Sequence, residues 1–370
     1  MPELGKAWKH FGYDCANFGD KLALELGKKR TAQEGEEIDS IAAEQLLTLT
    51  YEDDNCGGGS EDDIKRMVGD SQEARTIQRI LQTCNFKAKA FVRSGMNDVQ
   101  EAGALGEKVL GIGYYAGKDK LHMKLRPVML TPGAKVRRAR IMSGKMIEDI
   151  KKGRLKVTKR MALSFVNGQY DPLGLIAPVS LKLKLQLKQL YQPERKYKWD
   201  EPLEEEQQQL WARSLEEAAA MEEVEFMRAV RPVHAKGKAW LIGFGDGSMD
   251  AYGAAIYTMW EVEDVNKTKV EVRLVLGKSR VTSQSGTTPP RAEAQAAVVL
   301  SRLMLLVVKA VRFPVERVIL ASDSEAFIAA TEKSSGTLGP YLNSRVSEFH
   351  LNIEDLRRKK TFWSPYSTCQ

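Results

Sequence analysis

The chain has 370 residues, of which 43% are hydrophobic and 28% are charged, and its formal net charge is +7. This composition is typical of a globular protein and excludes a disordered one. The length predicts two or three domains of roughly 100 to 200 residues each. No apolar stretch reaches the roughly 18 residues of a membrane span, and the N-terminus lacks a signal-peptide core. An intracellular protein of the cytoplasm or nucleus, without a membrane partner, is therefore expected.

The first third of the chain predicts an α+β pattern. Residues 20–45 are expected to be largely helical, and LLTLTY at 46–51 is typical of a strand. After three glycines, Ser60 is a candidate N-cap for a helix that runs on toward Leu81. Short strands are expected at 86–95, 108–117 and 120–130.

Three adjacent acids, Glu52, Asp53 and Asp54, stand between the first predicted strand and the glycines. They must repel one another. One explanation is an exposed acidic turn, and the other is a hairpin whose carboxylates bind a divalent metal. These residues alone leave both explanations open.

Positive charge is concentrated in residues 135–160, which hold eleven Lys and Arg against two acids, a local balance of +9. Such a segment would attract a polyanion through phosphate contacts and counterion release. A solvated basic face or linker is the alternative. Residues 200–225 are strongly acidic, so the positive charge is local. The cations of this segment that we expect to bind nucleic acid are Arg137, Arg138, Arg140, Lys151, Lys152 and Arg154.

The middle of the chain predicts helices. Residues 181–187 alternate between apolar and polar as a strand would, but apolar residues from Val179 to Leu190 also form a helical stripe. A helix is favoured because the run has few β-branched residues. From Pro202 to Val224, an early proline, early glutamates and a helical apolar repeat predict a second helix.

The pattern changes near residue 235, where a domain boundary is expected. AWLIGFGDGS and AYGAAIYTMW predict a β-hairpin, and KVEVRLVLGKSRV predicts a third strand. PPRAEAQAAVVLSRLMLLVVKAV predicts a long apolar helix. RVILASDS is apolar enough to predict a fourth, central strand, followed by two helices and a fifth strand at KTFWSPY.

Three carboxylates fall at suggestive places in this layout. Asp246 ends the first of these strands, Glu293 lies in the first turns of the long helix, and Asp323 ends the fourth strand. Each has a structural explanation, as a turn residue, a helix-dipole partner and a helix cap, respectively. If the first and fourth strands are neighbours and the helix crosses them, however, the three side chains converge at one sheet edge. Unpaired negative charge is costly there, and a divalent metal would offset it.

The ordered set GFGDGSMDAYGAAIY, GKSRVTSQSGTTPPRAEAQAAVVLSRL and VILASDSEA resembles the ribonuclease H domain of BEL/Pao long-terminal-repeat retroelement polyproteins. Upstream, FGDKLALEL, the hairpin at 51–54, VLGIGYY, KRMALSFVNGQYDPLGLIAPVSLKLKLQLKQL and WDEPLEEEQQQLW are similar to the family's reverse transcriptase palm, thumb and connecting segment. The resemblance extends from about residue 18. It implies a multidomain chain of α/β and α+β class: a partial reverse transcriptase palm at 1–130, a basic helical thumb or connection at 131–235, and a C-terminally truncated RNase H-like mixed sheet flanked by helices at 236–370.

For the RNase H half, the resemblance implies that Asp246, Glu293 and Asp323 hold two Mg²⁺, or Mn²⁺, and hydrolyse RNA in RNA–DNA hybrids. Lys278 and Arg280 are further implied contacts to nucleic acid. Arg291 would contact a phosphate or form a surface salt bridge. The family's fourth acid would follow the fifth strand, beyond Gln370, so weakened activity is expected.

For the polymerase half, Asp53 and Asp54 match the metal-binding aspartates of reverse transcriptases. Glu52 departs from the family pattern, which has a small or apolar residue there, and the family's first catalytic aspartate has no match upstream. Polymerisation is therefore not expected.

Two functional classes stay open. The first is a ribonuclease H within a truncated retroelement polyprotein, with other segments of that polyprotein as partners. The second is a non-catalytic, repurposed nucleic-acid-binding or structural protein, packed into a ribonucleoprotein. The three acids in order favour the first class, and the truncation favours the second.

Overall fold

The computed structural model describes residues 29, 32–33, 35–51, 54–55, 57–59, 61–69, 75–83, 112–123, 125, 144–192, 194–264, 267–283, 287–333 and 337–358. The chain divides into two compact units, Met1–Asp119 and Lys120–Gln370. The domain boundaries expected near residues 130 and 235 stay predictions. Among the described helices, none combines the length and the apolar character needed to cross a bilayer.

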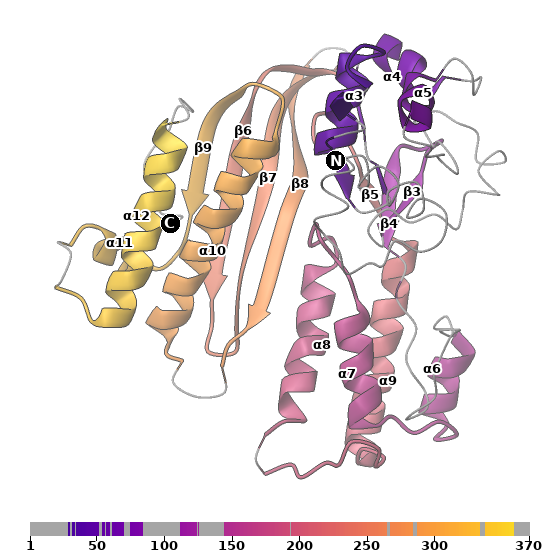
Figure 1. Cartoon of the computed structure of the whole chain (residues 1–370). Coiled ribbons are helices and arrows are strands. Elements are labelled where there is room, and N and C mark those ends of the chain that lie inside the picture. The colour runs from indigo at the N-terminus through magenta and orange to yellow at the C-terminus, as the bar shows by residue number, and fades with distance from the viewer. Residues whose placement is uncertain are drawn as a thin grey trace, which may run out of the picture. The chain divides into compact units, whose positions relative to one another are not determined.

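The first unit has three described helices, α3 (Ser40–Thr48), α4 (Glu61–Val68) and α5 (Thr76–Thr83) (Figure 1). Their apolar faces form one core, whose buried members are Ala42, Ala43, Leu46, Met67, Ile77 and Ile80. Strands β1 (Thr50–Tyr51) and β2 (Asp54–Asn55) pair antiparallel as a hairpin, while its metal binding stays a prediction. Strand β3 (Ile112–Tyr115) lies within the strand expected at 108–117, while the one expected at 86–95 lies outside the described residues.

Two predictions for this unit are wrong. Residues 46–48 form the last turn of α3 and not a strand, because Leu46 packs into the core between the helices. The single helix predicted from Ser60 toward Leu81 is instead two helices, with α4 ending at Val68 just before Gly69. Glycine is a poor helix former, so a break there is consistent with local propensity.

One carboxylate connects the three helices of the first unit. Asp39 caps α3 by accepting a hydrogen bond from the Ala42 N–H at 3.1 Å. Its second oxygen accepts from Arg66 Nε of α4 at 2.8 Å and from Thr76 Oγ1 of α5 at 2.8 Å. Burial raises the pKa of Asp39, but these hydrogen bonds and the charge of Arg66 outweigh burial, so the pKa lies below its ordinary value of 3.8.

The second unit begins with a two-stranded pairing and a group of helices. Strand β4 (Lys120–Met123) pairs antiparallel with β5 (Glu225–Met227). Between them lie α6 (Gly144–Lys151), α7 (Lys159–Gly168), α8 (Ala177–Gln189), α9 (Glu205–Ala220) and a short 3₁₀ helix at Met221–Glu223. The helices favoured over residues 179–190 and predicted over 202–224 are thus confirmed as α8 and α9.

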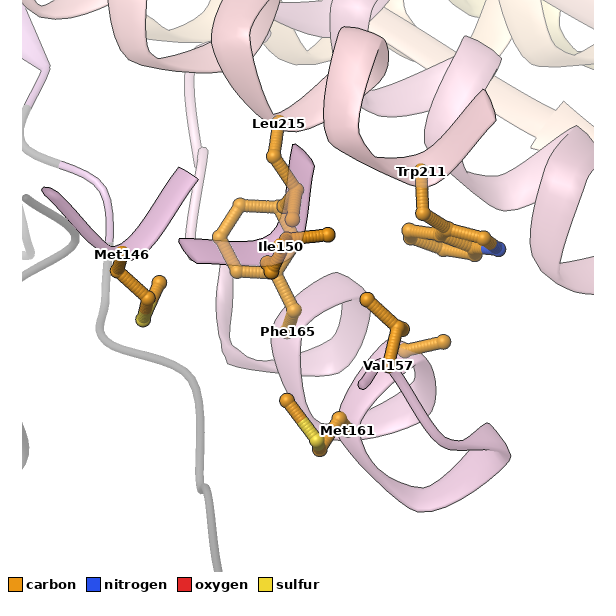
Figure 2. Close-up of a pocket in the computed structure, with 8 residues that line it drawn as sticks. Met146, Ile150, Val157, Met161, Phe165, Trp211 and Leu215 are labelled. Atoms are coloured by element: carbon orange, nitrogen blue, oxygen red, sulfur yellow. The ribbon is translucent and has the colours of Figure 1, made fainter. Parts of the chain in front are cut away.

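The core of this helical group lies between α6, α7 and α9. Figure 2 shows side chains from the three helices gathered around one small apolar gap, with Phe165 and Trp211 as the aromatic members. Phe165 is 1% exposed and Trp211 is fully buried. The other lining residues are Met146, Ile150, Val157, Met161, Ala162 and Leu215.

The rest of the second unit is built on a four-stranded sheet. Its strands are β6 (Ala235–Gly247), β7 (Ala251–Asp264), β8 (Lys267–Val281) and β9 (Val315–Ala321), in the order β8-β7-β6-β9 (Figure 1). Neighbours β8, β7 and β6 run antiparallel, whereas β6 and β9 run parallel. The predicted hairpin and third strand are confirmed.

One long helix packs on this sheet, and two further helices pack against that helix. Helix α10 (Pro289–Ala310) packs against β6 and β7, and α12 (Pro340–Arg358) packs beside α10, with α11 (Glu325–Thr331) between β9 and α12 along the chain. In the described part of the sheet β9 has β6 as its neighbour and ends the order, and the central position expected for the fourth strand stays a prediction. Its apolar side chains are buried by helices, since Val318 packs with Phe327 and Phe349 in the core. The fifth strand expected at KTFWSPY lies outside the described residues.

Replacing Asp39 with Asn should loosen α3, α4 and α5 together by about 1–3 kcal/mol, because a charge-assisted hydrogen bond to Arg66 is lost. The folded-state pKa of Asp39 is lowered, so its stabilisation is present above the unfolded-state pKa and is lost as pH falls below about 3.8. Hydrogen–deuterium exchange of these helices in the full chain, corrected for intrinsic rates, measures both effects. The exposed neighbour Asp62→Asn is the control, and wild-type protection in Asp39→Asn at neutral pH would contradict the prediction.

Replacing Phe165 with Ala should lower the free energy of unfolding by about 3–5 kcal/mol, because it opens a cavity in a core that is already closed to solvent. Urea unfolding followed by circular dichroism measures the change. Val233→Ala, at a side chain that is 92% exposed, should stay within about 0.5 kcal/mol of the wild type. If Phe165→Ala lowered the free energy of unfolding no more than the control does, this core would not be packed as described.

Candidate active site

The carboxyl end of β6 lies directly against the start of α10. Gly247 follows Asp246, and a Cβ built on Gly247 would lie 2.5 Å from the carbonyl oxygen of Ala292 and 2.7 Å from the backbone nitrogen of Glu293. Any side chain at position 247 would therefore push the helix away. Because glycine has no side chain, the backbone of Glu293 can lie close to Gly247, next to Asp246.

The parallel pairing of β6 with β9 places Asp323 at the same end of the sheet. The register puts Phe244 opposite Ala321, so Asp246 and Asp323 each lie two residues beyond the last matched pair. Because parallel strands end at the same sheet edge, the two aspartates leave that edge side by side. Both side chains are exposed. The expectation that the first and fourth strands are neighbours with the helix across them is confirmed.

A hydrogen bond connects the helix to the end of β9. Ser324 Oγ donates to Glu293 Oε2 and accepts from the Phe327 N–H at 3.2 Å, so one buried hydroxyl caps α11 and holds the glutamate. Ser324 is 5% exposed, and Glu293 is partly buried. The three acids, separated by 47 and 30 residues in the sequence, therefore arise from one small area at the end of the sheet.

The structural explanations of the three acids can be compared with their observed places. Asp246 is not a turn residue, because β6 continues through Gly247. Asp323 is not the cap of the following helix, because Ser324 caps α11. Glu293 lies beyond the first turn of α10, which contains no acid. None of the three simpler roles therefore accounts for these carboxylates.

The donor set fits a divalent cation in chemistry, because carboxylate oxygens are the ligands that Mg²⁺ and Mn²⁺ prefer. Gly247 is also consistent with a cation site, because the absence of a side chain there lets the backbone of Glu293 lie close to the strand ends. Within the described residues, however, no three acidic, His or Cys side chains are already arranged as a metal-holding group. The two exposed aspartates would have to turn toward Glu293.

The described part of the basic segment is largely paired with acids. Lys151 Nζ lies 2.6 Å from Glu216, Arg154 lies 2.6 Å from Asp149, and Lys152 pairs with Glu148. Two further cations of the segment contact acids of the 200–225 region, with Lys156 3.2 Å from Glu205 and Arg160 2.7 Å from Asp200. The acidic helix α9 thus offsets part of the local positive charge. A nucleic-acid role for Lys151, Lys152 and Arg154 stays a prediction, and Arg137, Arg138 and Arg140 lie outside the described residues.

The remaining predicted site residues fall in different places. Lys278 and Arg280 are exposed on β8, at the same end of the sheet as Asp246. Arg291 is exposed at the start of α10, where its guanidinium lies 5.1 Å from the ring centre of Tyr341. Asp54 lies in β2 with its backbone paired to Tyr51, whereas Asp53 lies outside the described residues. Their binding roles stay predictions.

Ser324 is the site residue that sequence reasoning missed. The segment SDSEAF offers a serine three residues before an apolar position, which is the spacing of an N-cap and its bonded N–H. The neighbouring Asp323 competes for the same role in the sequence, because aspartate is an equally good cap. The contact from Ser324 to Glu293 has no sequence signal, because it joins residues 31 apart.

Comparison with known families bears on the region that holds this site. Residues 158–324 match the family model described as the Pao retrotransposon-like RNaseH-like domain. The match contains all three acids and Ser324, and it begins at the N-cap residue of α7, so helices α7 to α9 belong to the matched region together with the sheet.

No curated protein matches the chain. Among solved structures, RNase H1 from the halophilic archaeon Halobacterium salinarum is similar at 13% identity, with 32% of this chain and 79% of that chain covered and a TM-score of 0.21. The N-terminal RNase H domain of a Mycobacterium tuberculosis protein, solved as a fusion with maltose-binding protein, is similar at 10% identity, with 35% and 84% covered and a TM-score of 0.21. The reverse transcriptase resemblance upstream stays a prediction. Residues 158–324 are therefore similar to a Pao-type, RNase H-like domain.

Proposed function

We propose that the RNase H-like region hydrolyses RNA in RNA–DNA hybrids, with Asp246, Glu293 and Asp323 as the ligands of two Mg²⁺ or Mn²⁺ ions. The observation that carries the proposal is the position of Glu293. Its backbone approaches Gly247, next to Asp246, and its carboxylate accepts a hydrogen bond from Ser324, next to Asp323. One residue thus connects the two strand ends that supply the other acids.

Bound divalent ions would supply activation of water and neutralisation of charge on a phosphodiester. The chain's own part is to present negative oxygens at a fixed edge of a rigid sheet. Asp246 and Asp323 are exposed and can turn toward a shared ion at little cost. Glu293 is less free, because Ser324 holds its Oε2. In this proposal Oε1 would bind the ion.

Ser324 is a positioning residue in this proposal. Its hydroxyl group donates a hydrogen bond to Glu293 and accepts one from the Phe327 N–H. Partners that orient a ligating carboxylate in this way typically matter 10- to 100-fold for metal affinity or activity. The helix cap and the orientation of the acid therefore depend on the same atom.

A second candidate function is nucleic-acid binding without catalysis. The hydrogen bond from Ser324 to Glu293 favours this second candidate, because it gives the Glu293 carboxylate a partner without a metal. The two candidates differ in one respect that is simple to measure. The first requires the acids for cleavage, and the second predicts binding that survives their removal.

Asp246→Asn should abolish Mg²⁺-dependent cleavage of labelled RNA in an RNA–DNA hybrid. The loss should exceed the roughly 10- to 100-fold effect of an outer partner, because a direct ligand is removed. Glu325→Gln, an exposed acid two residues after Asp323, is the matched control and should cleave as the wild type does. Equal cleavage by Asp246→Asn and wild type would point to a contaminating nuclease and exclude catalysis at this site.

Ser324→Ala should raise the Mg²⁺ concentration needed for half-maximal cleavage by about 10- to 100-fold. It should also lower the free energy of unfolding by about 0.5–2 kcal/mol, because the cap of α11 is lost. Thr158→Ala removes a cap of the same kind from α7, away from the acids, and should cost similar stability without changing the metal dependence. If the two variants shift the metal dependence equally, Ser324 has only a structural role.

A further inference from the structure

A tight junction joins the helical group to the edge of the sheet where β8 lies. The Gly277 N–H of β8 donates to the carbonyl oxygen of Leu173 at 2.8 Å, and Ser279 Oγ donates to the carbonyl oxygen of Ala177 at 3.3 Å. A Cβ on Gly174 would lie 2.2 Å from the Gly277 carbonyl oxygen, and the φ of Gly174 is +72°. Glycine alone fits both the close contact with Gly277 and the positive φ. The start of α8 is thereby held directly on β8.

Asp171 fixes the loop that makes this junction. Its two carboxylate oxygens accept hydrogen bonds from the Leu175 and Ile176 N–H groups, each at 2.9 Å. At the far end of the same contact, Lys188 of α8 donates to Thr282 Oγ1 at 3.1 Å and lies 3.6 Å from Asp250. The helix therefore has a defined position along the strand.

Three cations meet at this junction. Lys184 of α8 is half-buried, and Lys278 and Arg280 of β8 are exposed. Burial lowers the pKa of the Lys184 ammonium first, and the nearby charges of Lys278 and Arg280 lower it further, while Asp171 opposes them. Across the part of the chain that the structure describes, none of the three cations makes an ion pair, in contrast to Lys151, Lys152 and Arg154. A bound anion would relieve their mutual repulsion.

The sheet register fixes the distance from these cations to the candidate active site. Arg280 lies opposite Tyr252, which lies opposite Gly247, and Lys278 lies opposite Ala254, which lies opposite Gly245. Two strand spacings of about 4.8 Å put the cations roughly 10 Å from the end of β6. Lys278 and Arg280 therefore extend from the same end of the sheet as Asp246.

We infer that Lys184, Lys278 and Arg280 form a phosphate-binding site for the nucleic-acid strand that occupies the Asp246 site. The inference rests on the proposed function for its occupant. The chemical reason is the match between three cations that make no ion pair among the described residues and a phosphate carrying negative charge. The junction through Gly174 and Gly277 makes the site rigid, since one cation comes from the helix and two from the strand.

The test measures binding of an RNA–DNA hybrid to full-length protein in an Asp246→Asn background, so that binding is separate from cleavage. Replacing Lys184, Lys278 and Arg280 together with Gln should weaken affinity and reduce the slope of log K against log salt by roughly 2 to 3. Lys182→Gln, at an exposed lysine of α8 that pairs with Glu217, is the matched control and should leave affinity and slope unchanged. The triple replacement of Lys151, Lys152 and Arg154 tests the competing surface.

A wild-type affinity and salt slope in the Lys184/Lys278/Arg280 variant would overturn the inference, as would an equal loss in the Lys182 control. Thermal unfolding separates binding from folding, because removing like charges should not lower the midpoint. A second measurement places a neutral methylphosphonate at one linkage of the hybrid at a time. One position should weaken binding in the parent and have no effect in the triple variant, and equal losses in both at every position would contradict the inference.

These outcomes are independent of the cleavage assay. If the wild type does not cleave but the salt slope depends on the three cations, the proposed function fails and the phosphate site stands. If the wild type cleaves and the slope does not depend on them, the phosphate site fails and the nuclease stands.

Discussion

The close approach of α10 to the end of β6 is the constraint on which the candidate site depends. At Gly247 there is no room for a Cβ, because the helix backbone at Ala292 and Glu293 occupies that space. The approach brings a helix residue to the carboxyl end of a strand, and the parallel neighbour β9 brings the third acid to the same edge. Three carboxylate-bearing residues therefore arise from one edge of the sheet, and the proposed function uses all three.

Much of this arrangement could be predicted from the sequence because its signals are local. The strand-hairpin-strand pattern, the long apolar helix and the acid at the end of each of two strands each come from a continuous stretch of residues. Helix α8 was the ambiguous case, since alternating residues favoured a strand and only the scarcity of β-branched side chains favoured a helix.

The parts that sequence reasoning missed depend on contacts between distant segments. Leu46 belongs to a helix because Met67 and Ile80 pack against it, although its own neighbours in sequence favour a strand. The bond from Ser324 to Glu293 is of the same kind, because a short polar side chain gives no indication of a partner far along the chain.

The charge of the chain illustrates a related limit. A count over residues 135–160 suggested the strongest attraction for a polyanion, but α9 places Glu205 and Glu216 against that segment. The cluster of Lys184, Lys278 and Arg280 is weaker in any sequence window, because its members are 94 and 96 residues apart from Lys184. Local charge density in a sequence therefore differs from the field that a ligand meets at the surface.

The parallel pairing of β6 with β9 also has a consequence for how the chain folds. Trp240 pairs with Arg317 across a long intervening stretch that includes β7, β8 and the whole of α10. Contacts between residues so far apart in sequence form slowly, because the entropy cost of closing a large loop comes before the contacts stabilise the fold. The hairpin of β6 and β7 has far less loop to close, so we expect it to form before β9 brings Asp323 to the edge that holds Asp246.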